Sequence, residues 1–68
     1  MQRYTLTTAG KLSAGDRFYK VTDKNKTIYQ VQELYHSLVV VKKDNGKWPE
    51  NMKKELEVIF LRNVNQLV

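Results

Sequence analysis

Apolar and polar residues alternate through much of the chain with a repeat of two residues. The clearest case is residues 27–35, TIYQVQELY, in which Tyr29 and Val31 share one face and Gln30 and Gln32 share the other. Successive side chains of a strand point to opposite faces, so this pattern predicts a strand with one buried and one solvent-exposed face.

Residues 38–43, LVVVKK, are rich in β-branched side chains and predict a second strand directly after the first. A three-residue loop, Tyr35–Ser37, would join the two strands in a hairpin. The pairs that this register brings together are Val31 with Val41 and Glu33 with Val39. A carboxylate on the apolar face is a misfit, which indicates a bulge or the rim of a barrel.

An earlier strand, residues 16–22, is indicated by its aromatic and β-branched side chains. It follows Ala14-Gly15, which suits the centre of a type II turn because glycine accepts a positive φ at the third position. The opening segment Arg3–Thr7 is compatible with a further edge strand.

The last third of the chain allows two interpretations. As a strand, residues 56–62 are apolar on both faces and place Val58 and Phe60 in the core. As a helix, residues 49–67 carry an apolar stripe with proline in the first turn, which gives an α+β alternative. The density of β-branched residues and the short length of 56–62 favour the strand.

With a strand at 56–62, residues 48–55 become a connection in which Met52–Glu55 are compatible with a helical turn. Asn63 is then suited to cap a short C-terminal helical turn, Val64–Val68.

Four to five short antiparallel strands with turns about every ten residues predict an all-β fold, a small barrel. The segment Leu12–Val21, LSAGDRFYKV, resembles the entry to the first strand of SH3-like β-barrels, in which a Leu-x-x-Gly-Asp turn opens the barrel. Leu56–Leu67, a VIFL-type strand before a short helical turn, is also similar. That class includes KOW and Tudor-type modules and many small proteins of phages and mobile elements. The resemblance implies a fold and a habit of binding.

The chain has 68 residues and no cysteine, which predicts one domain, residues 1–68, with a small core. Disulfides and Cys-based zinc sites are excluded. No apolar run approaches the roughly 20 residues that span a bilayer, and the N-terminus lacks the apolar region of a signal peptide. We therefore expect a cytoplasmic protein that does not contact membranes.

Residues that carry catalysis are scarce. His36 is the single histidine and falls in the predicted hairpin loop, where a solvated role is expected. Glu55 and Glu57 share the solvent face of a strand, and no glycine-rich phosphate loop is present. We predict that the protein is not an enzyme and has no catalytic residues, no metal site and no cofactor.

The positive charge is concentrated in the first part of the chain. There are 12 Lys and Arg against 7 Asp and Glu, and from Pro49 onward the two signs balance, so the whole excess of +5 lies in residues 1–48. Consecutive antiparallel strands bring alternate turns to the same end of a sheet. The turns at 23–26 and 44–47 are therefore expected at one pole. We call the residues gathered there the basic rim: Lys24, Lys26, Lys42, Lys43, Lys47 and Trp48.

The basic rim predicts a binding module for nucleic acid, contacted through phosphates and one stacked base. Two alternatives stay open. One is a protein–protein interaction module of the phage or mobile-element accessory or inhibitor type. The other is a homodimeric structural subunit, paired through the two-faced strand 56–62 or an open sheet edge. Trp48 itself also fits a structural role in which it covers the end of the barrel.

Overall fold

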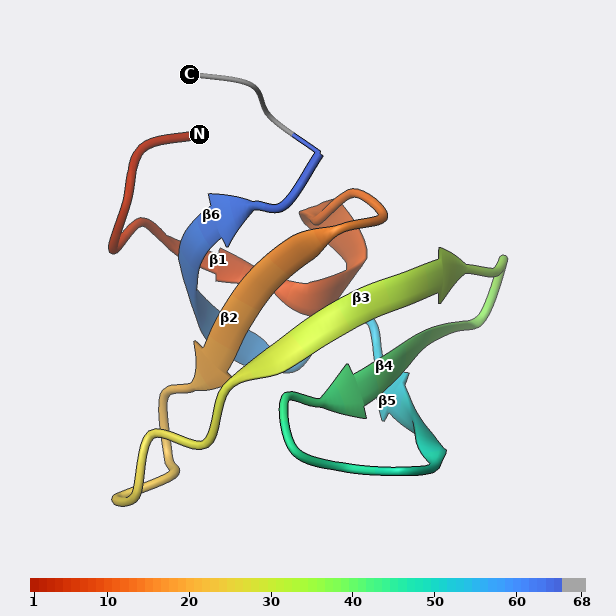
Figure 1. Ribbon diagram of the computed structural model, residues 1–68. Coiled ribbons are helices and arrows are strands. Elements are labelled where there is room, and N and C mark those ends of the chain that lie inside the picture. The colour runs from red at the N-terminus through yellow and green to blue at the C-terminus, as the bar shows by residue number, and fades with distance from the viewer. Residues whose placement is uncertain (66–68) are drawn as a thin grey trace.

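A computed structural model describes residues 1–65 of the chain, which form one antiparallel sheet of six strands (Figure 1). The strands are β1 Leu6–Thr8, β2 Asp16–Lys20, β3 Tyr29–Leu34, β4 Leu38–Lys43, β5 Pro49–Lys53 and β6 Glu57–Asn63, and a 3-10 helix, η1, spans Ala9–Lys11. Their order in the sheet is β1-β6-β2-β3-β4-β5. The chain thus makes a meander from β2 to β5 and then returns beside β2. This confirms a mostly β protein.

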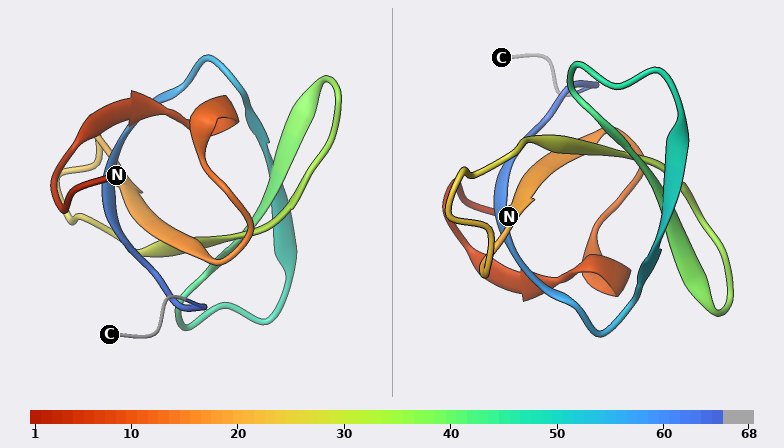
Figure 2. Two further views of the ribbon diagram at one scale, coloured as in Figure 1. Left: turned by 90° about the horizontal axis from the view of Figure 1, so that it is seen from above. Right: turned by 90° about the horizontal axis from the view of Figure 1, so that it is seen from below.

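The sheet curls so that η1, which follows the edge strand β1, lies beside the other edge strand, β5 (Figure 2). Helix η1 is bonded to the turn between β5 and β6: the Ala9 N–H donates to the Leu56 carbonyl and the Gly10 N–H donates to the Lys54 carbonyl, both at 2.9 Å. A Cβ on Gly10 would lie 2.9 Å from the Lys54 Cβ, so this close approach requires glycine.

The core lies on the inner face of the curl. Its buried residues are Ala9, Leu12, Phe18, Tyr29, Val31, Val39, Val41, Met52, Val58 and Phe60. Phe18 and Tyr29 stack with ring centroids 5.7 Å apart. The prediction that 56–62 is a strand with Val58 and Phe60 in the core is confirmed, and the alternative of one helix over 49–67 is wrong.

The turn predicted at Ala14-Gly15 is present. The Asp16 N–H donates to the Ser13 carbonyl at 3.0 Å, and Gly15 has a φ of +91°. The buried Asp16 carboxylate accepts bonds from the Ser13 N–H and the Asn63 side-chain amide, both at 2.7 Å. These bonds tie the entry to β2 to the end of β6.

Tyr35–Ser37 connect β3 to β4, as predicted, but the predicted register is wrong near this tip. The Tyr35 N–H donates to the Leu38 carbonyl, so these two residues lie opposite each other. Glu33 therefore pairs with Val40 rather than Val39. Deeper in the hairpin the predicted register is confirmed, because Val31 pairs with Val41.

The expected bulge is present in β3, and it explains why the register near the tip differs from the register deeper in the hairpin. Gln32 is the extra residue on β3, because the pairing shifts between Val31 and Glu33. The shift takes Glu33 off the apolar face, where its carboxylate accepts a hydrogen bond from the Tyr35 hydroxyl. This bond raises the pKa of Tyr35.

Strand β5 was not predicted, because PENMK lacks the β-branched and aromatic residues that mark strands. Only Met52 is buried, and it pairs with Val39 of β4. Proline is tolerated as the first residue of an edge strand. The predicted edge strand Arg3–Thr7 is present in part, as Leu6–Thr8.

The C-terminal prediction is tested only in its first residues. The Asn65 N–H donates to the Asn63 side-chain oxygen at 2.7 Å, and Val64–Asn65 form a turn. The rest of the predicted helical turn Val64–Val68 lies outside the described residues. No helix among residues 1–65 is long and apolar enough to cross a membrane.

Candidate functional site

The two basic turns lie at the same end of the sheet, at the bottom of Figure 1. The Asp44 N–H donates to the Ile28 carbonyl at 2.9 Å, so the base of the turn after β2 touches the turn after β4. Tyr29 and Lys43, the first residue of β3 and the last of β4, are paired. The topology that motivated the basic rim is therefore present.

Lys24 and Lys26 sit on an arm, residues 21–28, that projects from the sheet (Figure 1). The Asp23 carboxylate accepts bonds from the N–H groups of Asn25 and Thr27 at 2.9 and 3.2 Å. The bond from Asn25 is the main cause that lowers the pKa of Asp23 below its ordinary 3.8. The ammonium of Lys26 lies 5.9 Å from the centre of the Tyr19 ring. Lys26 therefore leans toward β2 rather than toward the turn after β4.

Lys42 and Lys43 leave β4 on opposite faces, because neighbouring side chains of a strand alternate. Lys42 is half-buried and lies opposite Gln30 on β3. Lys43 is exposed at the inner rim, where its ammonium is 3.8 Å from the Glu50 carboxylate. The basic rim is consequently divided between the two faces of the sheet.

Lys47 and Trp48 follow a tight turn closed by the Gly46 N–H, which donates to the Lys43 carbonyl at 2.9 Å. Trp48 is 79% exposed, more than any other large hydrophobic residue described. It does not cover the end of the barrel, so the structural interpretation of this indole is wrong. The indole stands in solvent beside an exposed lysine.

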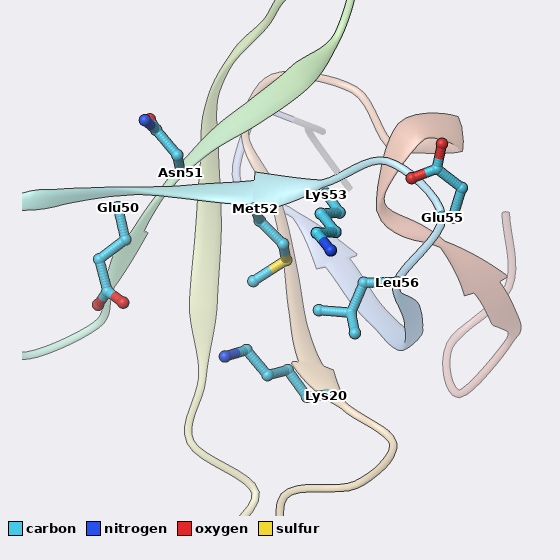
Figure 3. A pocket seen from close by; sticks show the side chains of 7 residues that line it. All are labelled: Lys20, Glu50, Asn51, Met52, Lys53, Glu55 and Leu56. Carbon is cyan, nitrogen blue, oxygen red and sulfur yellow. The ribbon is translucent and has the colours of Figure 1, made fainter.

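A depression of about 420 Å³ lies between β5 and the end of β2 (Figure 3). Met52 and Leu56 supply its apolar part. Its charged residues balance, with two of each sign: Lys20, Lys53, Glu50 and Glu55.

This depression lacks the arrangement that acid–base chemistry needs. Glu50 lies near the start of β5 and Glu55 in the turn after it, and their carboxylates point apart in Figure 3. His36 is exposed in the β3–β4 loop. Residues 1–65 contain no group of three or more side chains placed to hold a metal ion.

Sequence reasoning missed a row of polar side chains on the outer face. Arg62, Arg17, Gln30 and Lys42 follow one another across β6, β2, β3 and β4. Arg17 also pairs with the Asp44 carboxylate. Arg17 was not singled out from the sequence, although it alternates with the core residue Phe18, and the pairing of β6 with β2 has no short-range signal in the sequence.

No protein-family model, curated protein or solved structure matches this chain.

Proposed function

We propose that the protein is a non-enzymatic binding module that contacts nucleic acid through backbone phosphates and stacks one base on Trp48. The 79% exposure of this indole beside Lys47 is the observation that carries the proposal. An aromatic ring that contributes nothing to the core offers a flat surface to any base, and stacking of this kind does not depend on sequence. We also assign the curled sheet to the SH3-like class.

The charges around Trp48 support an anionic ligand. The carboxylates of the two turns and of the start of β5 are already engaged: Asp44 pairs with Arg17, Glu50 lies near Lys43, and Asp23 accepts backbone N–H bonds. Among residues 1–65, Lys24, Lys42 and Lys47 form no ion pair. Their ammonium groups are thus available to displace the counterions that condense on a phosphate backbone.

Single strands are the expected ligand, because a base must be unpaired to stack on an indole. Trp48 is the single tryptophan of the chain, so its fluorescence reports directly on the proposed contact. The test is a titration with short single- and double-stranded oligonucleotides at several salt concentrations. Quenching by single strands and a steep loss of affinity with salt are expected.

The double variant Lys42→Ala/Lys43→Ala should weaken binding to all sequences alike. It should also flatten the salt dependence by about one unit per lost phosphate contact. A wild-type protein that binds neither kind of oligonucleotide at low ionic strength would contradict the proposal.

The edge of β5 favours a second candidate, a protein-interaction module. β5 is a terminal strand of the sheet and borders the depression lined by Met52 and Leu56. An extended segment of a partner protein, or of a second copy of the chain, can add to such an edge. Pull-down from lysate with and without nuclease discriminates the candidates, since one stoichiometric partner that survives nuclease favours a protein. Light scattering over a concentration series tests a homodimer.

A further inference from the structure

All arginines of the chain gather at one place on the outer face. Arg3, Arg17 and Arg62 line a shallow depression of about 310 Å³ together with Ile28, Leu61 and Asp44. The residues come from the N-terminal segment, β2, the base of the arm, the turn after β4 and β6. Figure 1 shows β6, β2 and β3 side by side.

The arginines on the two neighbouring strands face each other directly. Arg17 and Arg62 are cross-strand partners, an arrangement of like charges that destabilises a sheet. A bulge creates it: Phe18 pairs with Phe60 while Arg17 pairs with Arg62, so Leu61 is an extra residue on β6. Bulges of this kind re-aim a side chain. Here Leu61 and Arg62 both reach the depression.

The hydrogen bonds of Arg17 are also incomplete. Its terminal nitrogen pairs with Asp44, but its buried Nε has no partner among the described residues. A buried donor without an acceptor is uncommon in native proteins. With Asp44 as the one carboxylate that lines the depression, the charge there is three positive against one negative.

We propose that Arg3, Arg17 and Arg62 form a binding site for a phosphate group. The planar guanidinium fork matches phosphate oxygens in bidentate geometry, and several arginines share the charge of one dianion. A bound phosphate offsets the repulsion between Arg17 and Arg62 and provides acceptors for the donors of Arg17. The site uses none of the residues of the basic rim, so this proposal can be tested independently of the proposed function.

The first test is a titration with inorganic phosphate at low ionic strength, followed through backbone amide shifts. Saturable shifts are expected at the residues that line the depression. Arg62→Gln should weaken this binding at least about tenfold, the loss of a charge-assisted contact. Lys53→Gln, which removes the same charge from an exposed residue of β5, should change it by no more than about twofold. Arg3→Gln is the second variant if Arg62→Gln loses the dispersed signals of the core.

A variant of Asp44 provides a second test, because the Asp44 carboxylate would compete with phosphate for Arg17. Asp44→Asn should tighten phosphate binding about two- to fivefold, the worth of a surface ion pair. Glu57→Gln carries the same charge change at the far end of β6 and should have no comparable effect. If the two variants gain phosphate affinity equally, the effect reflects only the change in net charge, and the proposed site is wrong.

The source of the phosphate is decided by repeating the series with a short single-stranded oligonucleotide. Loss of oligonucleotide affinity in Arg62→Gln, with competition by inorganic phosphate, identifies a nucleic-acid backbone. Arginine-dependent binding of phosphate alone identifies a small phosphorylated compound. Equal behaviour of Arg62→Gln and Lys53→Gln toward both probes overturns the proposal, whatever Trp48 does.

Discussion

Along β4, Val39 and Val41 are fully buried on the inner face of the sheet, whereas Val40 and Lys42 are half-buried on the outer face. The contrast continues across the sheet. The inner face carries Phe18, Val31, Val58 and Phe60, while the row Arg62, Arg17, Gln30 and Lys42 crosses the outer face. The same strands build both surfaces, since alternate residues of each strand belong to different faces.

The difference shows how a chain of this size separates folding from recognition. A domain of about this length buries only about 60% of its unfolded surface, so one compact apolar face must supply most of its stability. The outer face is then free to carry charge. We therefore expect substitutions on the inner face to lower stability and substitutions on the outer face to leave the fold intact.

The largest effect is expected from Phe60, which is 4% exposed on the inner face. Phe60→Ala removes most of an aromatic side chain from the core and should cost about 3–5 kcal/mol of unfolding free energy. A loss of this size is comparable to the whole stability of a small domain, so dispersed amide signals should disappear. The neighbouring Leu61→Ala, on the outer face, should leave the fold intact. Similar losses in both variants would contradict the division.

A closer comparison uses three consecutive valines of β4. Val39→Ala should lower the unfolding free energy by about 1.5–3 kcal/mol, because this side chain is fully buried. Val40→Ala deletes the same atoms from a half-buried position and should cost clearly less. Urea denaturation of the two variants measures the difference directly. Val41→Ala should behave like Val39→Ala.

The inner face could be predicted from the sequence because its signal is local. Alternation within single segments identified Tyr29, Val31, Val58 and Phe60 as core residues, and the misfit of Glu33 indicated a bulge. Strand β5 was not predicted, because its sequence has no strand propensity. Its pairing with β4 makes it a strand.

The outer face was less accessible to prediction, because its composition depends on which strands become neighbours. The meander placed the two basic turns at one end, but it did not show that Lys26 leans toward Tyr19. The arginine cluster depends on the pairing of β6 with β2 and on one extra residue at Leu61. Contacts between residues about 45 positions apart leave no periodic trace in a sequence.

Trp48 belongs to neither face, and its removal separates binding from folding. Trp48→Ala should weaken single-stranded oligonucleotide binding by about 1–3 kcal/mol if one base stacks on the indole. The unfolding free energy of the Trp48→Ala variant should stay within about 0.5 kcal/mol of the wild type, as expected for an exposed side chain. Tyr35→Ala, at the opposite tip, is the matched control and should leave binding unchanged. A fall in stability without a loss of affinity would assign Trp48 to the fold.

The smallest effect is expected from Asp23, whose half-buried side chain organises the arm by accepting the N–H bonds of Asn25 and Thr27. Its folded pKa is lowered below the ordinary 3.8, chiefly by the backbone N–H of Asn25. A lowered folded pKa means that the carboxylate stabilises the native state above its unfolded pKa, and that this contribution is lost as pH falls through the folded pKa. The carboxyl carbon signal of Asp23 should therefore titrate below 3.8, and Asp23→Ala should flatten the acid side of the stability profile. The core should keep its signals throughout, since the arm makes no contribution to the inner face. A midpoint at or above 3.8 would show that the arm is not organised by this side chain.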